Sequence, residues 1–253
     1  MLYIIGLGIG DESDISQRGL DACRKADEVC AELYTARWQG DLRKLGKAIG
    51  KGIKVLERQD LEDRSEKFVK GAKGKDVALL VPGDPLSATT HINLLMEARH
   101  EKIPFTVIHS SSIMTAIAET GLNIYNFGKT ATVVRPQEGY APTSFYEAGI
   151  INKRSGMHTL FLLDVDMDTR LGLEILLEIE KKRKRGVLGP DTNVVAASGI
   201  GTRKSIIRYD KVRNLLKQPL RPPAVLIIPG RRHFVEREWL DSLKERIRFS
   251  EHM

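Results

Sequence analysis

Short runs of apolar residues recur along the first half of the chain and are separated by segments with helical spacing. The runs span residues 2–5, 29–33, 53–56, 77–81 and 105–108. Runs of this length are typical of strands that are buried on both faces. Strands that alternate with helices predict a mostly parallel sheet, and ligands are expected at the carboxyl ends of its strands.

Two helices are predicted around the last of these runs. Ile92, Leu95 and Met96 are spaced i, i+3 and i+4, which predicts a helix that buries these three side chains. The segment 113–117 repeats the same spacing, and Gly121 can end that helix. Both helices therefore belong to the β-α-β rhythm of the first half.

The pattern changes at residues 122–128, where we place a domain boundary. Further strand candidates follow, at 130–134, 159–165, 193–198, 205–210 and 224–230. We expect an α/β fold with two domains, 1–122 and 128–253, and more antiparallel pairing in the second.

The most basic stretch of the chain, KKRKR, ends the predicted helix 167–186. Leu171, Ile175 and Ile179 lie on one face of this helix, and Gly186 can terminate it. Cations in a last turn are favoured by the helix dipole, and no aromatic side chains are interleaved with them. The stretch therefore favours a solvated helix end over a nucleic-acid-binding patch, which is the alternative.

Composition is that of a soluble globular protein, with 42% hydrophobic and 29% charged residues in 253. No run approaches the roughly 20 apolar residues of a membrane span, and the first residues lack a basic signal-peptide segment. Cys23 and Cys30 are too few for a disulfide framework or a metal cluster. We expect a cytoplasmic protein with no metal and no membrane partner, and a net charge of +7 mildly favours anionic partners.

The first strand runs into GLGIGD at residues 6–11. Glycines between a strand and a helix often admit a ligand, but Asp11 occupies the place of the third glycine in G-x-G-x-x-G. A carboxylate there would repel a pyrophosphate, so the ligand is cationic or uncharged. A tight turn without a ligand is the alternative. Ser13 or Asp14 is predicted to cap the following helix.

Two later strands run into comparable loops. After 77–81 comes PGDP at 82–85, whose prolines make a rigid turn, and Thr89 or Thr90 can cap the next helix. After 105–108 comes HSSSI at 109–113, again small residues that enter a helix. We expect the three loops to lie along one edge of one sheet.

Several side chains in these loops have structural alternatives to a functional role. Asp84 can simply cap its own turn through an Asx hydrogen bond. His91 and His109 are candidate general bases, but histidines at such positions are more often structural. We therefore name no catalytic residue.

These loops and other segments resemble the class III S-adenosylmethionine-dependent methyltransferases, the tetrapyrrole methylase superfamily. The resemblance covers nearly the whole chain. The further segments are AELYT (31–35), TGLNIYNFGKTATV (120–133), PTSFYE (142–147) and IIPGRRHFVE (227–236), in this order.

The resemblance implies two αβα domains with S-adenosyl-L-methionine in an interdomain cleft and S-adenosyl-L-homocysteine as product. A carboxylate such as Asp84 or Asp11 suits the sulfonium and ammonium groups of that cofactor, and apolar side chains suit its adenine. The implied cofactor-binding residues are Ile9, Asp84, Ser87, Ser112, Ile113, Leu163, Ile200 and Ala224. Alternatively, Ser112 is only a first-turn helix residue, and Leu163 and Ala224 are only strand core.

The branch most resembled is an archaeal one in diphthamide biosynthesis, which implies elongation factor 2 as the protein substrate. The implied reaction trimethylates the amino group of the 3-amino-3-carboxypropyl arm on the factor's modified histidine. An amine with a pKa of roughly 8 needs no strong base near neutral pH. The resemblance also implies a homodimer, and we expect no direct nucleic-acid binding.

Two other functions stay open from the sequence. One is a different reaction of the same superfamily, the methylation of a tetrapyrrole or of ribosomal RNA. The other is a regulatory module that binds S-adenosylmethionine or a nucleotide without catalysis. Measured methyl transfer separates the second from any enzyme.

Overall fold

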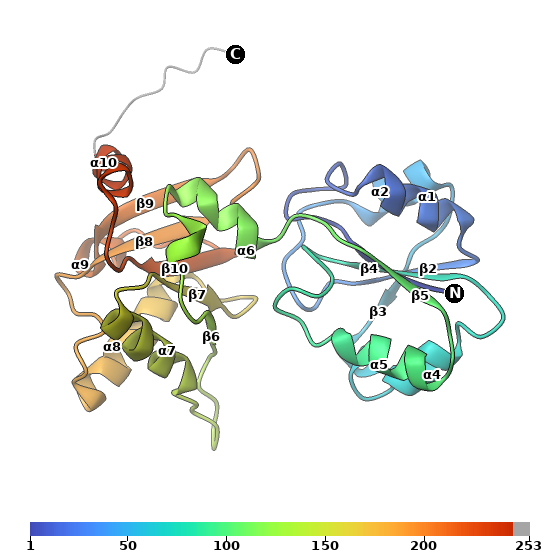
Figure 1. The fold of residues 1–253 in the computed structure, drawn as a ribbon, viewed down its shortest axis with the longest axis horizontal. Helices are drawn as coiled ribbons and strands as arrows, with labels where there is room; N and C mark the ends of the chain where they lie inside the picture. Colours follow the sequence, from blue (N-terminus) through green and yellow to red (C-terminus); the bar gives the residue numbers. More distant parts are fainter. Residues whose placement is uncertain (245–253) are drawn as a thin grey trace, which may run out of the picture. The chain divides into compact units, whose positions relative to one another are not determined.

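The computed structural model describes residues 1–244, which form two compact units, Met1–Ala116 and a second that begins at Ile117 (Figure 1). The sequence placed the boundary later, near 122–128. The reason for the difference is that residues just before this point pack within the second unit. Gly121 lies against the Trp239 ring, and the Asn123 amide donates to the Glu236 carboxylate at 2.7 Å.

The first unit contains a five-stranded parallel sheet in the order β3-β2-β4-β1-β5. Its strands are β1 (Leu2–Gly6), β2 (Glu28–Glu32), β3 (Lys54–Leu56), β4 (Val77–Val81) and β5 (Phe105–Ile108). Every residue of β4 is buried because helices cover both faces of the sheet, as parallel sheets require. The predicted parallel sheet is confirmed.

Helices cover this sheet on two sides (Figure 1). They are α1 (Gln17–Lys25), α2 (Leu42–Ile49), α3 (Arg58–Leu61), α4 (Ser65–Lys70) and α5 (Ile92–His100), and the short helix α6 (Ile113–Ala116) comes after β5 in the chain. Alternate residues of β4 point to opposite faces, so Leu79 packs in one core with Leu94 of α5 while Leu80 packs in another with Cys23 of α1. The sheet therefore has a dry core on each side.

Two helix predictions in the first unit are wrong in detail. The first helix is capped by Ser16, which accepts from the Gly19 amide, and not by Ser13 or Asp14. Helix α5 buries Leu95 but leaves Ile92 and Met96 exposed by 52% and 63%. The buried face of α5 is formed by Leu94, Leu95 and Ala98 instead.

The start of α5 also differs from the prediction. Neither Thr89 nor Thr90 caps this helix, since His91 occupies the cap position without a side-chain cap bond. The Thr89 hydroxyl instead donates to the Pro85 carbonyl at 3.1 Å. Thr89 thereby holds the preceding loop, and its hydroxyl also accepts from the His91 amide at 3.3 Å.

The second unit has a mixed five-stranded sheet in the order β6-β7-β10-β8-β9. Its strands are β6 (Ala131–Val133), β7 (Thr159–Leu163), β8 (Asn193–Ser198), β9 (Ile206–Lys211) and β10 (Ala224–Ile228). Only β6 and β7 pair in parallel, while the other neighbours are antiparallel. The expected increase in antiparallel pairing is confirmed.

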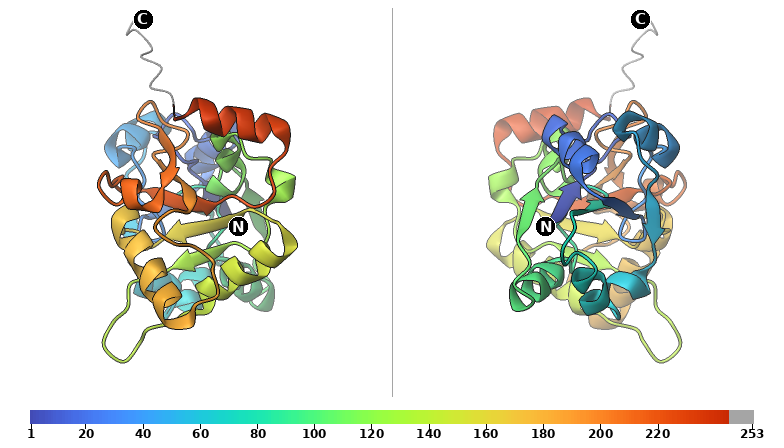
Figure 2. Two further views of the ribbon diagram at one scale, coloured as in Figure 1. Left: turned by 90° about the vertical axis from the view of Figure 1, so that its left-hand side faces the viewer. Right: turned by 90° about the vertical axis from the view of Figure 1, so that its right-hand side faces the viewer.

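Four α-helices and two short 3₁₀ helices complete the described part of the second unit. They are η1 (Ile117–Thr120), η2 (Ile124–Asn126), α7 (Ser144–Ser155), α8 (Thr169–Arg183), α9 (Val212–Leu215) and α10 (Phe234–Ser242). Helices α7 and α8 lie on one face of the sheet and α10 lies on the other (Figure 2). The main core of the unit is the layer between the sheet and α7 and α8.

The basic helix α8 buries Ile175 and Ile179 as predicted, with Leu171 partly buried. It ends at Arg183, three residues before the predicted stop at Gly186, because Lys184 adopts the left-handed conformation. The Gly186 amide then donates to the Glu180 carboxylate at 2.7 Å. The KKRKR lysines are exposed, as expected for a solvated helix end.

Candidate cofactor site

The three small-residue loops meet at one edge of the first sheet. They follow β1, β4 and β5, which are neighbours in the sheet and parallel, so their carboxyl ends lie together. Gly8 and Gly83 exchange backbone hydrogen bonds of 3.1 and 2.8 Å, and the Ile9 amide donates to the Ser111 hydroxyl at 3.3 Å. The predicted clustering of these loops is confirmed.

The glycines of the first loop admit protein atoms at this edge. A Cβ on Gly6 would lie 2.5 Å from the Gly83 carbonyl oxygen, and one on Gly10 would lie 2.8 Å from Asp14 Oδ2. Gly8 has a positive φ of 77°, which other residues rarely adopt. The sequence pattern predicts that these glycines make space for a ligand. In the structure, atoms of neighbouring residues lie where the side chains of these glycines would be.

The Asp84 carboxylate contacts both the second and the third loop. Its Oδ1 accepts from the Leu86 amide at 3.0 Å and from the Ser87 hydroxyl at 3.3 Å, which is the predicted Asx turn. Its Oδ2 accepts from the Ser110 amide at 3.3 Å and lies 2.7 Å from His109 Nδ1. Asp84 therefore holds the two loops together as well as its own turn.

The carboxyl group of Asp84 is ionised at neutral pH although it is 7% exposed. Burial acts to raise its pKa, but the Leu86 amide, the His109 imidazole and the Ser110 amide lower it below the ordinary value. A buried anion at the edge of the sheet favours a ligand that carries positive charge nearby.

The first loop adds further negative charge to the same edge. Asp14 accepts from the Gly10 amide at 2.7 Å, and Asp11 accepts from the Ser13 amide and hydroxyl at 2.9 and 2.6 Å. These carboxylates consume the local backbone donors that a phosphate would need. The edge is therefore suited to a cationic or neutral ligand.

The structure brings the five predicted residues of the first unit onto these three adjacent loops. Ile9, Ser87 and Ile113 are half-buried, while Asp84 and Ser112 are buried. Ser112 precedes α6, and its hydroxyl accepts from the Met114 amide at 3.2 Å, so this side chain also has the structural role that the sequence left open.

The three predicted residues of the second unit also lie near one another. Leu163 ends β7, Ala224 begins β10 and Ile200 follows β8. The pairings Val225 with Leu162 and Ala224 with Ser198 place the three at the same edge of the second sheet. Leu163 also packs on Gly172, where a Cβ would lie 2.7 Å from its side chain.

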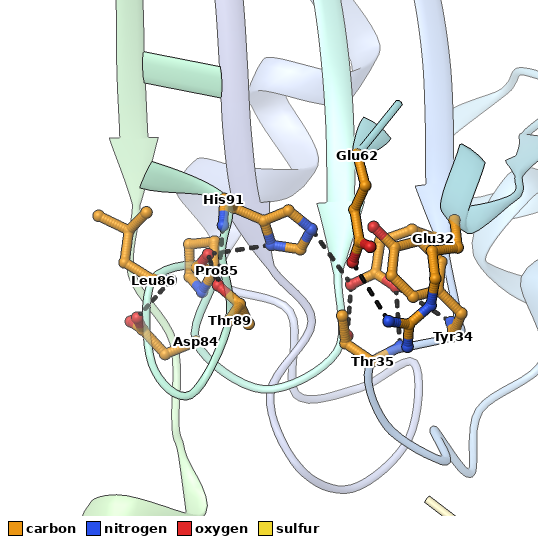
Figure 3. Close-up of polar contacts among 10 residues, drawn as sticks. Glu32, Tyr34, Thr35, Glu62, Asp84, Pro85, Leu86, Thr89 and His91 are labelled. Atoms are coloured by element: carbon orange, nitrogen blue, oxygen red, sulfur yellow. Dashed lines mark hydrogen bonds and ion pairs between the residues drawn. The ribbon is translucent and has the colours of Figure 1, made fainter. Parts of the chain in front are cut away.

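A fourth loop, after β2, carries a buried acid that the sequence analysis did not single out. Glu32 is 0% exposed, and its Oε2 accepts from the Tyr34 and Thr35 amides at 3.0 and 3.1 Å (Figure 3). Its Oε1 accepts from the Thr35 hydroxyl and faces His91 Nε2 at 3.8 Å. A charged residue within the apolar run 29–33 was the signal that could have revealed it.

Two other kinds of site have no support among residues 1–244. No group of three or more histidine, cysteine or acidic side chains is placed to hold a metal, and none of the helices has the length and apolar character of a membrane span. Burial raises the pKa of both Cys23 and Cys30 to about 12, so these thiols are unreactive at neutral pH.

Comparisons with known proteins agree with this geometry. The family model of the Tetrapyrrole (Corrin/Porphyrin) Methylases matches residues 1–216. The chain is 38% identical to proteins named diphthine synthase from Methanocaldococcus jannaschii and Methanococcus maripaludis, over 98% of this chain and 100% of each relative. A crystal structure of diphthine synthase matches with a TM-score of 0.87 at 34% identity, over 96% of this chain and 95% of that one.

Proposed function

Since this chain belongs to the diphthine synthase family of the tetrapyrrole methylases, which are S-adenosylmethionine-dependent methyltransferases, we propose that it methylates elongation factor 2. The acceptor is the amino group of the 3-amino-3-carboxypropyl arm on the factor's modified histidine. Three transfers give diphthine, a step of diphthamide biosynthesis. The observation that carries the proposal is 38% identity to diphthine synthases along almost the full length of both chains.

S-adenosyl-L-methionine supplies a methyl group on a sulfonium, which an amine displaces in line. The chain fits this cofactor because ionised Asp84 and the acidic first loop favour positive charge at the carboxyl edge of the first sheet. Ile9, Ser87, Ser112 and Ile113 complete the contacts of the first unit. From the second unit, Leu163, Ile200 and Ala224 contribute apolar and main-chain contacts to the adenine.

The chain contributes position and electrostatics, and no dedicated base is required. The reaction moves positive charge from donor to acceptor, so orientation of the two groups is the main requirement. His91 is 2% exposed and cannot reach a substrate amine, and we assign no base role to His109, whose Nδ1 contacts Asp84. An amine with a pKa of roughly 8 has a usable neutral fraction at neutral pH.

Calorimetry with S-adenosyl-L-homocysteine and NAD tests the cofactor. We expect S-adenosylhomocysteine to bind and to stabilise the fold by about 2.7 kcal/mol at a hundredfold excess over Kd, and NAD to do neither. Binding of NAD but not of S-adenosylhomocysteine would contradict the proposal.

Labelled S-adenosylmethionine tests the acceptor when it is offered with arm-bearing elongation factor 2, ribosomal subunits and a tetrapyrrole in separate reactions. We expect label in the factor alone. Label in RNA or in the tetrapyrrole would assign another reaction of the superfamily, and cofactor binding without any transfer would assign a regulatory module. A cytoplasmic homodimer belongs to the same proposal, and sedimentation of the purified protein tests the dimer.

A further inference from the structure

His91 packs against the PGDP turn. The residue is 2% exposed, and its Nδ1 lies 3.3 Å from the Pro85 carbonyl oxygen (Figure 3). Pro85 directly follows Asp84, whose carboxylate joins the second and third loops of the candidate cofactor site. The imidazole therefore supports the loop that carries the buried carboxylate.

The Pro85 carbonyl fixes which ring nitrogen of His91 carries a proton. A carbonyl oxygen can only accept, so the 3.3 Å contact requires a proton on Nδ1. In a neutral imidazole this leaves a bare lone pair on Nε2. His91 Nε2 is one of three buried side-chain nitrogen or oxygen atoms without a hydrogen-bond partner in residues 1–244.

Nε2 points at another acceptor, the Glu32 carboxylate. The distance from Nε2 to Glu32 Oε1 is 3.8 Å, which is beyond a hydrogen bond but within the range of an ion pair. Glu32 is fully buried and already accepts from two backbone amides and the Thr35 hydroxyl. The contact from Nε2 to Glu32 therefore packs the ring without a hydrogen bond, and the Nδ1–H is the polar group that fixes the ring orientation.

Charged groups of the neighbouring segments have partners of their own. The Arg58 guanidinium lies over the Tyr34 ring at 5.0 Å and pairs with Glu62 at 3.4 Å, and burial raises the pKa of Tyr34, which stays neutral. On the loop side, Asp84 is engaged by His109. Burial lowers the pKa of the His91 imidazole below its ordinary value, although the Glu32 charge opposes that shift. The ring is therefore neutral at neutral pH, with its one proton on Nδ1.

We propose that His91 is a positioning residue for the Asp84 loop. The Nδ1–H of its ring and the Thr89 hydroxyl both donate to the Pro85 carbonyl and together hold it in place. The role rests on the proposed function, because it assigns the loop to S-adenosylmethionine.

Substitutions test this role. His91→Asn keeps a donor near the Nδ1 position, while His91→Phe removes both ring nitrogens. Glu32→Gln removes the facing charge and offers an amide N–H to Nε2. His158→Asn is the matched control, since His158 is equally buried but lies in the second unit.

The first readout is calorimetric binding of S-adenosylhomocysteine together with kinetics in S-adenosylmethionine. We expect His91→Phe to raise Kd and KM about tenfold with kcat at saturation nearly unchanged, and His91→Asn to stay within about threefold of the wild type. His158→Asn should lower the melting temperature and leave Kd unchanged. A folded His91→Phe protein with wild-type Kd would overturn the positioning role.

The second readout is ¹⁵N NMR of the imidazole at pH 7 to 8, which does not depend on the cofactor. We expect a protonated Nδ1 and an unprotonated Nε2 in His91, and an Nε2 signal that shifts in Glu32→Gln, whose amide can donate to it. A protonated Nε2 with an unprotonated Nδ1 in the wild type would overturn the hydrogen bond to the Pro85 carbonyl and with it the positioning role. Failure of the wild type to bind S-adenosylhomocysteine would overturn both the proposed cofactor and the positioning role, whereas normal binding with unaltered variants overturns the role alone.

Discussion

Each unit buries one histidine against one glutamate, and the two pairs differ in the backbone group that the ring meets. In the second unit the Gly230 amide donates to His158 Nδ1 at 2.8 Å, so the ring proton lies on Nε2 and contacts Glu236 Oε1 at 3.1 Å. In the first unit a carbonyl takes the place of that amide. The proton of His91 therefore lies on Nδ1, and Nε2 faces Glu32 without a hydrogen bond.

The His158–Glu236 pair is a structural contact, whereas the His91–Glu32 pair supports a loop of the candidate cofactor site. Glu236 also accepts from the Asn123 and His233 amides at 2.7 Å each, so its lone pairs are used. His91 contacts the loop of Asp84 directly, and Glu32 faces the other side of its ring. Substitutions of the His158–Glu236 pair should therefore lower the free energy of unfolding, whereas substitutions of the His91–Glu32 pair should weaken ligand binding.

The largest effect is expected when the contacts of Glu236 in the second unit are removed. Glu236→Ala leaves the His158 Nε2–H and two backbone amides without an acceptor, and we expect it to lower the free energy of unfolding by about 3–5 kcal/mol. Denaturant unfolding measures this, with Glu236→Gln as the milder control. A loss below about 1 kcal/mol would show that these hydrogen bonds are replaced by water.

The next effect concerns Asp84, whose loop is contacted by His91. Asp84→Ala loses both the charge and the turn bond to the Leu86 amide, so we expect the affinity for S-adenosylhomocysteine to fall by about 1.5–3 kcal/mol. Asp84→Asn keeps the turn and should lose less. Titration calorimetry on the folded variants checks both values, and unchanged affinity in Asp84→Ala would return the residue to a turn-capping role.

A smaller effect tests whether the close packing of the first and second loops requires a glycine at position 6. Gly6→Ala places a Cβ 2.5 Å from the Gly83 carbonyl oxygen, and we expect a loss of about 1–3 kcal/mol in stability. Gly52→Ala is the matched control, because no heavy atom lies within 4 Å of its Cβ position. Equal melting temperatures for the two variants would mean that the loops can separate without cost.

The smallest effect is acid sensitivity from Asp84 and Glu236. Burial acts to raise both pKa values, but the backbone amides and histidines that contact these carboxylates lower them below the ordinary range. Their stabilisation is present above the unfolded pKa values of about 4 and is lost as pH falls through the folded ones, by at most about 1.4 kcal/mol per pH unit for each group. Unfolding between pH 2 and 6 measures the slope, and Glu236→Gln should reduce it. An unchanged slope would assign it to other carboxylates.

The sequence predicted the strands of the first unit because β1 and β4 are buried between helices and therefore consist of continuous apolar runs. It also predicted the three loops at the sheet edge, since small residues, prolines and Asp84 mark turns after strands. The apolar face of α5 was wrong because both choices of face include Leu95, and only packing shows that Leu94 is buried and Met96 is not.

The Glu32–His91 pair was beyond prediction for a different reason. The two residues are far apart in sequence and meet only because β2 pairs with β4, whose loop leads to His91. Which ring nitrogen meets a carbonyl or an amide depends on loop backbone that no periodicity encodes. The cofactor-binding residues stay a prediction, since the structure shows their clustering within each unit and not their ligand.

Mass spectrometry of elongation factor 2 after reaction tests the central claim most directly. The factor is incubated with this protein and S-adenosylmethionine, once with and once without the 3-amino-3-carboxypropyl arm on its histidine. We expect up to three added methyl groups on the modified histidine when the arm is present and none when it is absent. An arm-bearing factor that stays unmodified, while parallel reactions with ribosomal RNA or a tetrapyrrole take up the methyl group, would contradict the claim.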